Sequence, residues 1–199
     1  MKWNKKDNSM EAEKIELRKR YLPENASVLD LFCGTGKMYK GAYQERVKNY
    51  HGVDHKKVHD KNICTLGDNI KFIKRNNISE YNVFDLDDYG CPWKLLYLIL
   101  RKATQDRLIF FITDGLVLKQ KMGGNVVNFV SATERIPKGM KLPGHNRFYK
   151  DIFATMLLDI EKRYGYKTTQ AVYFHNKRRT VYYWMVEMLK AGTPEFTTK

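Results

Sequence analysis

The sequence VLDLFCGTGK at residues 28–37 combines a short apolar run with the carboxylate of Asp30 and two glycines, Gly34 and Gly36. The apolar run predicts a buried strand, and the glycines, which lack a Cβ, allow a tight turn that brings the backbone close to a ligand. A helix that follows such a turn offers free backbone N–H groups. About twenty residues later, NYHGVD predicts a second strand that ends in the carboxylate of Asp54. This spacing is typical of a fold that binds a nucleotide-like ligand.

The rest of the chain alternates short apolar runs with helical stretches, which predicts a parallel sheet with right-handed crossovers. TTQAVYFH and RRTVYYWMVEM near the C-terminus predict an antiparallel hairpin. We therefore expect one α/β domain over residues 1–199, with an irregular insertion at 114–147. Earlier strands are expected at 28–32, 50–54, 82–87 and 107–113, with a short segment near 63–66, and helices at 9–21, 37–47, 68–76, 92–104 and 148–164.

The run from Asp30 to Gly36 resembles motif I of the class I S-adenosylmethionine-dependent methyltransferases. A dinucleotide site would place a third glycine where this chain has Tyr39. The resemblance implies a Rossmann-like α/β fold with a mostly parallel seven-stranded sheet, an antiparallel C-terminal strand and S-adenosylmethionine as cofactor. It also implies that Asp30 orients the turn and the methionine amino group, and that Asp54 accepts from both ribose hydroxyls. The cofactor-binding residues so implied are Asp30, Phe32, Gly34, Gly36, Asp54, His55, Asp68, Asn69 and Asp87.

Asp68 has two interpretations. It lies where the family often places an acidic residue against the adenine amine, and it also precedes a predicted helix, where an aspartate commonly caps the first turn.

The segment FDLDDYGCPW follows the fourth expected strand, at the position that faces the transferred methyl group in this family. It resembles the D-P-F/Y-G-S-P signature of the tRNA guanosine N2-dimethyltransferases. Asp87 matches the first aspartate, Tyr89 the aromatic residue and Pro92 the last proline, whereas Asp88 replaces a proline and Cys91 a serine. Thr113 and Asp114 resemble a T-D segment of the same family, so the similarity extends over about residues 28–124. The large C-terminal domain of that family has no counterpart here.

An aromatic amine delocalises its lone pair into the ring, so an enzyme must accept its hydrogens to turn the lone pair toward the methyl group. Asp87 is suited to accept one hydrogen and finally the proton, and a backbone carbonyl near Asp88 to accept the other. Tyr89 is suited to stack on the base. The predicted catalytic residues are therefore Asp87, Asp88 and Tyr89, and no metal is required because the methyl donor is already charged.

Alternatives remain open at this position. Asp85, Asp87 and Asp88 are also residues that cap a strand end and the next helix. DNA amino-methyltransferases carry [DNS]-P-P-[YFW] here, and DDYG has the acid and an aromatic residue without the prolines. Cytosine-5 methylases share D-L-F-C-G but use a Pro-Cys nucleophile, whereas this chain reads Cys91-Pro92. A noncatalytic nucleic-acid-binding module with the same fold is a further alternative.

The chain carries 36 Lys and Arg against 22 Asp and Glu, a formal net charge of +14, which predicts a polyanionic partner. Nucleic acid is the expected partner, with RNA favoured over DNA. The insertion contributes basic residues above the target pocket, and Arg18, Lys19 and Arg20 are a candidate extension of the phosphate track. The predicted substrate-binding residues are Tyr89, Pro92, Lys119, Lys121, Lys141 and Arg147.

We expect no membrane-spanning segment, no secretion signal, no disulfide and no zinc site. No apolar run approaches the roughly 20 residues needed to span a bilayer. The polar N-terminus has no apolar signal core, so a cytoplasmic location is expected. Cys33, Cys64 and Cys91 are odd in number and widely spaced, which favours free thiols over disulfides or a zinc site.

Overall fold

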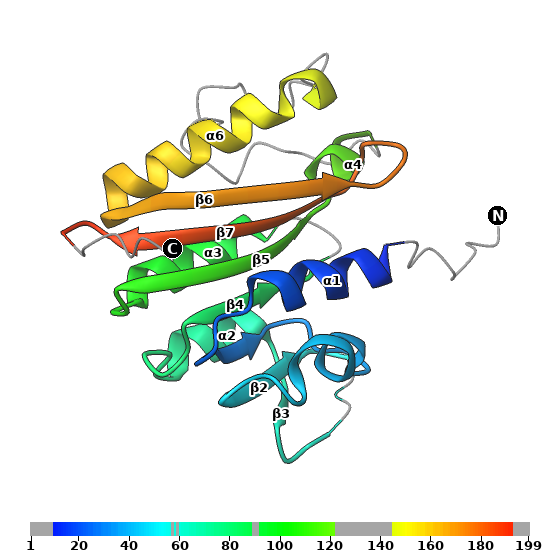
Figure 1. Cartoon of the computed structure of the whole chain (residues 1–199), viewed down its shortest axis with the longest axis vertical. Helices are drawn as coiled ribbons and strands as arrows, with labels where there is room; N and C mark the ends of the chain where they lie inside the picture. Colours follow the sequence, from blue (N-terminus) through cyan, green and yellow to red (C-terminus); the bar gives the residue numbers. More distant parts are fainter. Residues whose placement is uncertain (1–9, 57, 59, 89–91, 122–144, 193–199) are drawn as a thin grey trace.

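The computed structural model of this protein describes residues 10–56, 58, 60–88, 92–121 and 145–192, with the backbone alone at 119–121 and 145–148. Its strands form one seven-stranded sheet in the order β3-β2-β1-β4-β5-β7-β6 (Figure 1). The strands are β1 Ser27–Asp30, β2 Asn49–Asp54, β3 Cys64–Leu66, β4 Val83–Leu86, β5 Arg107–Asp114, β6 Tyr166–His175 and β7 Tyr182–Lys190.

The first five strands are mutually parallel, whereas β7 runs antiparallel to β5 and pairs with β6 as an antiparallel hairpin. The predicted mostly parallel sheet and its antiparallel end are confirmed. Because β1 is flanked by β2 and β4, the carboxyl ends of these three strands lie side by side. The order reverses direction at β1, which is where ligands bind in open α/β sheets.

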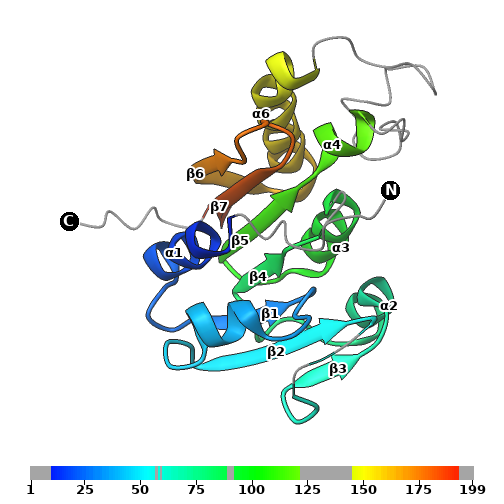
Figure 2. The same cartoon turned by 90° about the vertical axis from the view of Figure 1, so that its right-hand side faces the viewer.

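Helices cover both faces of the sheet, which gives three layers (Figure 2). The helix α1, Glu11–Tyr21, and the short π-helix η1, Tyr39–Tyr43, lie on one face. On the other face lie α2 Asn69–Arg75, α3 Trp93–Lys102 and α6 His145–Tyr164, and α4 Leu116–Lys121 follows β5.

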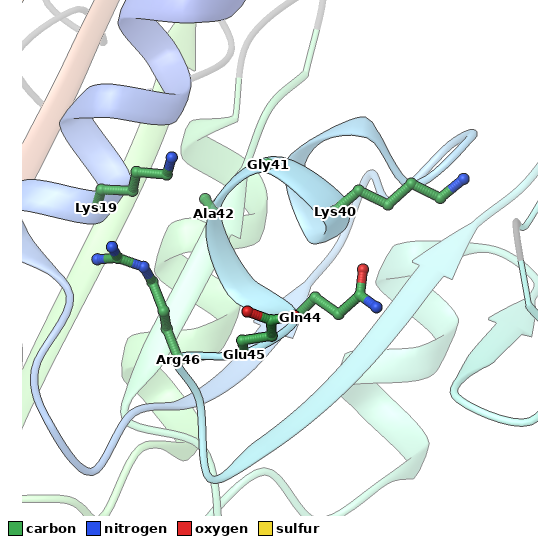
Figure 3. Close-up of a pocket in the computed structure, with 7 residues that line it drawn as sticks. All are labelled: Lys19, Lys40, Gly41, Ala42, Gln44, Glu45 and Arg46. Atoms are coloured by element: carbon green, nitrogen blue, oxygen red, sulfur yellow. The ribbon is translucent and has the colours of Figure 1, made fainter.

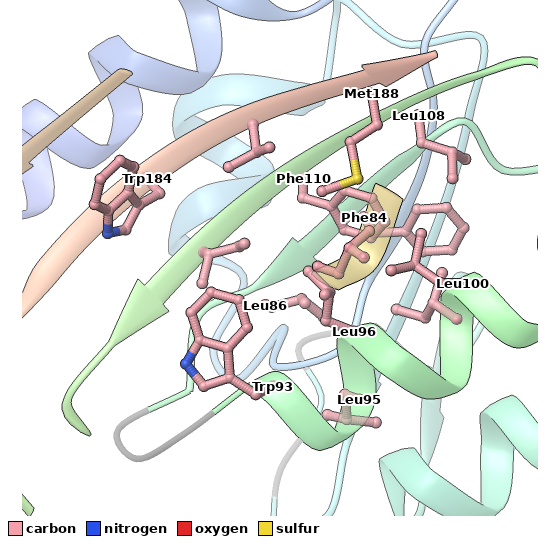
Figure 4. Packing of buried hydrophobic residues seen from close by; sticks show 14 of the residues in the cluster. Phe84, Leu86, Trp93, Leu95, Leu96, Leu100, Leu108, Phe110, Trp184 and Met188 are labelled. Atoms are coloured by element: carbon pink, nitrogen blue, oxygen red, sulfur yellow. The ribbon is translucent and has the colours of Figure 1, made fainter. Parts of the chain in front are cut away.

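Side chains alternate between the two faces of the strands, so each face has its own buried cluster. Beneath α3 and α6, Phe84 and Phe110 stack at 5.5 Å between ring centroids (Figure 4). Trp93 meets Phe153 edge-on in the same cluster. The smaller cluster beneath α1 contains Val28, Val83, Ile109, Phe111 and Met185. The central parallel strands β1, β4 and β5 are buried on both faces, as expected for parallel strands covered by helices.

One predicted element differs. The helix expected at 37–47 is short and contains a π-turn, in which the N–H of Gln44 donates to the carbonyl of Tyr39 at 2.9 Å. The reason is tertiary, because α1 packs directly on this segment. A Cβ on Gly41 would lie 2.5 Å from the side chain of Ile15, so close approach needs glycine there. The extra residue in the turn is typical of a functional site.

Two expectations concern segments that are only partly described. The helix expected from residue 9 begins at Glu11, and its N-cap residue, Met10, makes no side-chain cap. In the insertion expected at 114–147, β5 continues to Asp114 and residues 116–121 form α4, so this part is regular. Residues 122–144 lie outside the described residues.

Candidate active site

The glycine turn after β1 is held by two carboxylates. Oδ1 of Asp30 accepts from the backbone N–H of Phe32 at 3.0 Å, and Oδ2 of Asp54 accepts from the N–H of Gly34 at 3.2 Å. Gly34 and Gly36 have φ values of 48° and 75°, a region that L-residues rarely enter. The sequence therefore uses glycine here because the turn is left-handed. These contacts bring Asp30, Phe32, Gly34 and Asp54 together at the turn.

Asp54 remains open to the surface side of the turn, with 14% of its side chain exposed. Its second oxygen accepts from the N–H of Lys56 at 2.8 Å, and Nδ1 of His55 lies 3.9 Å from the same oxygen. The side chain of His55 is exposed. A carboxylate has two acceptor oxygens, each with two lone pairs, which suits it to accept from both hydroxyls of a vicinal diol.

Asp68 and Asn69 lie at the start of α2. Oδ1 of Asp68 accepts from the N–H of Lys71 at 2.7 Å, so the exposed Asp68 is the N-cap of α2. Asn69 is buried, and its amide donates to the carbonyl of Leu31, which ties α2 to the glycine turn. Its other amide atom, Oδ1, has no hydrogen-bond partner among the described residues. A buried acceptor beside the turn fits a ligand that brings a donor, such as an adenosine group.

Asp30 is almost completely buried. Oδ2 accepts from the hydroxyl of Tyr50 at 3.0 Å, and only 1% of the residue is exposed. Burial, and then the neighbouring charge of Asp85, raise the pKa of Asp30 well above its usual value. Its observed contacts anchor the turn, and the predicted contact with the methionine amino group stays a prediction.

A buried ion pair lies beside Asp30, on the face covered by α1. The guanidinium of Arg18 donates from Nε and Nη2 to the two oxygens of Asp85, both at 2.6 Å, and the hydroxyl of Tyr43 donates to the same carboxylate at 2.6 Å. Arg18 is 2% exposed and Asp85 is fully buried. The expectation that Arg18 extends a phosphate track is wrong, because its charge is satisfied inside the protein. Lys19 and Arg20, which follow it, are exposed.

Asp87 follows β4 on the same face as Asp85, since side chains alternate along an extended chain. The hydroxyl of Thr113 donates to Oδ1 at 2.6 Å, and the ammonium of Lys14 pairs with Oδ2. Burial alone would raise the pKa of Asp87, but the charges of Lys14 and Arg18 and the hydrogen bonds from Lys14 and Thr113 together outweigh it and lower the pKa. This carboxylate is therefore held ionised near the rim of the sheet, with 16% of its side chain exposed.

Lys14 was missed by the sequence analysis, and Arg18 was misassigned. The available signal was their spacing of four residues, which places both on one face of α1. That face also carries polar residues, so a solvated helix surface was the simpler interpretation. Only the packing of α1 on the sheet brings these cations to Asp85 and Asp87.

Asp114 lies on the opposite face, at the end of β5. Its oxygens accept from the indole of Trp93 at 3.0 Å, the hydroxyl of Tyr149 at 2.6 Å and the N–H of Leu116 at 2.8 Å. Burial raises the pKa of Asp114 to about 6. Three donors explain how a fully buried carboxyl is tolerated, and they tie α3, α4 and α6 to the end of β5.

The other predicted substrate residues are placed less fully. Pro92 is buried at the N-cap of α3, and Asp88 is half-buried. Lys119 and Lys121 lie on α4 and Arg147 on α6, with backbone alone described. Tyr89, Lys141 and Cys91 lie outside the described residues.

The described part of the chain also shows the state of the cysteines, the potential metal ligands, the helices and the surface cavities. Cys33 and Cys64 are buried free thiols, as predicted. No group of three potential metal ligands and no helix long and apolar enough to cross a bilayer is found among those residues. A surface cavity of about 270 Å³ lies between α1 and η1, lined by Lys19, Lys40, Gly41, Ala42, Gln44, Glu45 and Arg46 (Figure 3). It contains Lys19 of the expected phosphate track and none of the other predicted site residues.

Replacing Gly36 by alanine tests the left-handed turn. Gly36→Ala is expected to lower the free energy of unfolding by about 1–2 kcal/mol, because an L-residue is strained at this φ. Urea unfolding followed by circular dichroism measures it. Gly67→Ala is the matched control, since a Cβ there would meet its nearest neighbour at 3.8 Å and no positive φ is required. Equal stability of the two variants would contradict the strain argument.

No protein-family profile and no curated protein matches the chain. Solved structures do match. M. jannaschii TYW2 in complex with AdoMet has a TM-score of 0.53 and 16% identity, over 88% of this chain and 74% of that one. The M. jannaschii tRNA m1G37 methyltransferase has a TM-score of 0.51 and 11% identity, over 94% of this chain and 51% of that one.

A putative hemolysin from Lactococcus lactis has a TM-score of 0.56 and 14% identity, over 94% of this chain and 89% of that one. The chain thus spans about half the length of the m1G37 methyltransferase and most of the length of the other two. At such low identities the likeness concerns the fold. The strand order, the antiparallel end and these neighbours together give the chain a Rossmann-like class I methyltransferase fold.

Proposed function

We propose that this protein is an S-adenosylmethionine-dependent methyltransferase that methylates an exocyclic amine of a nucleic acid base, with guanine N2 in RNA as the best candidate. The observation that carries the proposal is the position and the ionised state of Asp87. It is an ionised carboxylate at the carboxyl end of β4, held by Thr113 and Lys14 beside a left-handed glycine turn. A carboxylate kept ionised can accept a hydrogen from an amine.

The proposed cofactor-binding residues lie in the glycine turn or next to it. Asp54 would accept from the ribose hydroxyls, and the unpartnered Oδ1 of Asn69 would accept from the adenosine moiety. Gly34 and Gly36 would let the backbone approach the cofactor, with Phe32 and His55 beside them. Asp30 would act through the turn that it holds. When bound, the cofactor supplies a methyl group on a positively charged sulfur, so no metal is needed to activate it.

The residues of the protein would then orient the amine and accept its hydrogens. Asp87 would accept one amine hydrogen, and the chain at Asp88 would accept the other, so that the nitrogen lone pair turns away from the ring. The amine nitrogen held by these residues would form its bond to the methyl carbon as the bond from that carbon to the donor sulfur breaks. The nitrogen then carries a positive charge, and its proton passes to Asp87. Alignment of these groups would supply much of the acceleration.

Nucleic acid is favoured as the substrate because of the net charge of +14. RNA is favoured over DNA because one of the structural neighbours is by name a tRNA m1G37 methyltransferase. Tyr89, Lys119, Lys121, Lys141 and Arg147 are proposed to contact the substrate, and Pro92 to support the catalytic segment. We also propose a cytoplasmic location.

The proposal is tested by incubating the protein with labelled S-adenosylmethionine and either unfractionated RNA or unmodified DNA. Digestion to nucleosides and mass spectrometry then identify the product, which is expected to be N2-methylated guanosine. Label in DNA alone would favour the DNA amino-methyltransferase alternative. Failure to bind S-adenosylmethionine by calorimetry would favour a noncatalytic nucleic-acid-binding module.

Asp54 provides a direct test of the cofactor site. Asp54→Ala is expected to weaken S-adenosylmethionine binding by about 10-fold or more, because it removes the acceptor for a diol and one contact to the turn. Isothermal titration calorimetry measures the change. Asp68→Ala is the control, since Asp68 caps α2 from an exposed position. A larger loss in Asp68→Ala than in Asp54→Ala would restore Asp68 as the adenine ligand.

A further inference from the structure

A row of four side chains crosses the sheet at its carboxyl rim. The hydroxyl of Thr113 binds Asp87, Thr113 is paired in register with Tyr183 on β7, and Tyr183 is paired with Phe174 on β6. Directly paired residues project to the same face of a sheet. Asp87, Thr113, Tyr183 and Phe174 therefore lie on one line on the face that α1 covers, and the carboxylate is at one end of it.

The two aromatic rings of this row stack on each other. The centroids of Phe174 and Tyr183 are 4.8 Å apart, with an angle of 22° between the ring planes. Both rings are partly exposed. Neither belongs to the two buried clusters of the described residues, whereas the neighbours Tyr182 and Trp184 on β7 are buried on the opposite face. The pair thus presents aromatic surface near the catalytic carboxylate without serving the core.

Lys14 adds a positive charge at the same place. Its ammonium pairs with Asp87 and lies 5.7 Å from the centroid of the Tyr183 ring, within the range of a cation–π contact. The carboxylate and the ring are therefore bridged by one cation carried on α1. Because Phe174 covers one face of the Tyr183 ring, a base that stacks on this ring would take the place of the Lys14 ammonium, next to Asp87.

We propose that Phe174 and Tyr183 form the platform on which the methyl-accepting base stacks. This inference rests on the proposed function, and it gives the stacking role to described residues rather than to Tyr89 alone. The ligand class is an unpaired nucleobase, whose π-face meets the rings and whose amine edge meets Asp87. Stacking of this kind tolerates any base, so discrimination between bases falls to the polar groups at the edge.

The alternative is that the two rings only stabilise the β6–β7 hairpin, as cross-strand aromatic pairs do. The two roles differ in their response to ring-preserving changes and to ligand. A hairpin contact affects stability in the absence of any ligand. A platform affects the affinity for an unpaired base, and any aromatic ring at position 183 satisfies it.

The test uses a single-stranded oligoribonucleotide with one 2-aminopurine, whose fluorescence is quenched when it stacks. The protein is titrated into this probe with S-adenosylhomocysteine present. The wild type is expected to quench the probe, and Phe174→Leu and Tyr183→Leu are each expected to weaken the affinity by about 10- to 100-fold. Tyr183→Phe is expected to remain within about 2-fold of the wild type, because its ring still stacks.

Tyr173→Leu is the matched control, because Tyr173 neighbours Phe174 on β6 but packs with Trp184 on the other face. Its affinity for the probe is expected to equal that of the wild type. Unquenched probe with the wild type, or equal affinities in the leucine variants, would overturn the platform, whatever the methyl-transfer assay gives. Quenching by the wild type without any transfer to RNA would instead refute the proposed function and leave the platform standing.

Discussion

Asp87→Asn is expected to reduce methyl transfer by about 10²–10⁴-fold, the usual contribution of a general base. Asparagine has nearly the same shape and keeps an oxygen for the hydroxyl of Thr113, which donates to Asp87 at 2.6 Å. It cannot take the proton that the amine loses, and it leaves the ammonium of Lys14 without its counter-charge. The loss is expected in kcat, measured by single-turnover transfer of labelled methyl to RNA.

Cofactor affinity separates this effect from a general disruption. The affinity of Asp87→Asn for S-adenosylmethionine is expected to stay within a few-fold of the wild type by calorimetry, because the glycine turn is held by Asp30 and Asp54. Asp106→Asn is the matched control, since Asp106 is an exposed aspartate that precedes β5 at the opposite rim of the sheet. Full turnover in Asp87→Asn would remove Asp87 from the mechanism.

Arg18→Met is expected to lower the free energy of unfolding by about 3–5 kcal/mol, the cost of breaking a buried ion pair by removing one partner. Methionine fills much of the space but leaves the carboxylate of Asp85 buried with the hydroxyl of Tyr43 as its remaining side-chain donor among the described residues. The charge of Asp85 would also act on the buried carboxyl of Asp30 without a compensating cation. Urea unfolding monitored by circular dichroism and fluorescence measures the change.

The neighbour in sequence supplies the control. Lys19 is exposed on the same helix, so Lys19→Met is expected to change stability by less than about 0.5 kcal/mol. The double variant Arg18→Met with Asp85→Leu is expected to regain part of the stability, since apolar replacements of both partners leave no buried charge. Wild-type stability in Arg18→Met would mean that the Arg18–Asp85 pair does not hold α1 on the sheet.

The fold was predictable because its signals are local. Alternating strand and helix patterns, with the glycine turn after β1, predict a parallel sheet, and the C-terminal hairpin pattern predicts the antiparallel end. The ends of most elements differ from the prediction by one to three residues, because helix and strand ends depend on individual caps. The pairing of Asp54 with the N–H of Gly34 follows from the same strand order.

The rest depended on contacts between distant segments. The four-residue spacing of Lys14 and Arg18 does not show that Arg18 is buried while Lys19 is exposed, because its partner Asp85 lies 67 residues away. Asp68 had two interpretations that only the bond to the N–H of Lys71 separates. The π-turn of η1 likewise reflects the packing of Gly41 against Ile15, which a local propensity cannot express.

The two cations of α1 meet two carboxylates of one extended segment, which couples the position of the helix to the sheet. Four residues of helix from Lys14 to Arg18 rise about 6 Å, and two residues of extended chain from Asp85 to Asp87 span about 6.6 Å. The spacing of the two cations along the helix therefore nearly equals the spacing of the two carboxylates along the strand. Sliding the helix by a single residue would mispair both charges at once, so the first helix can seat on the sheet in one register, and only that register gives Asp87 its counterion.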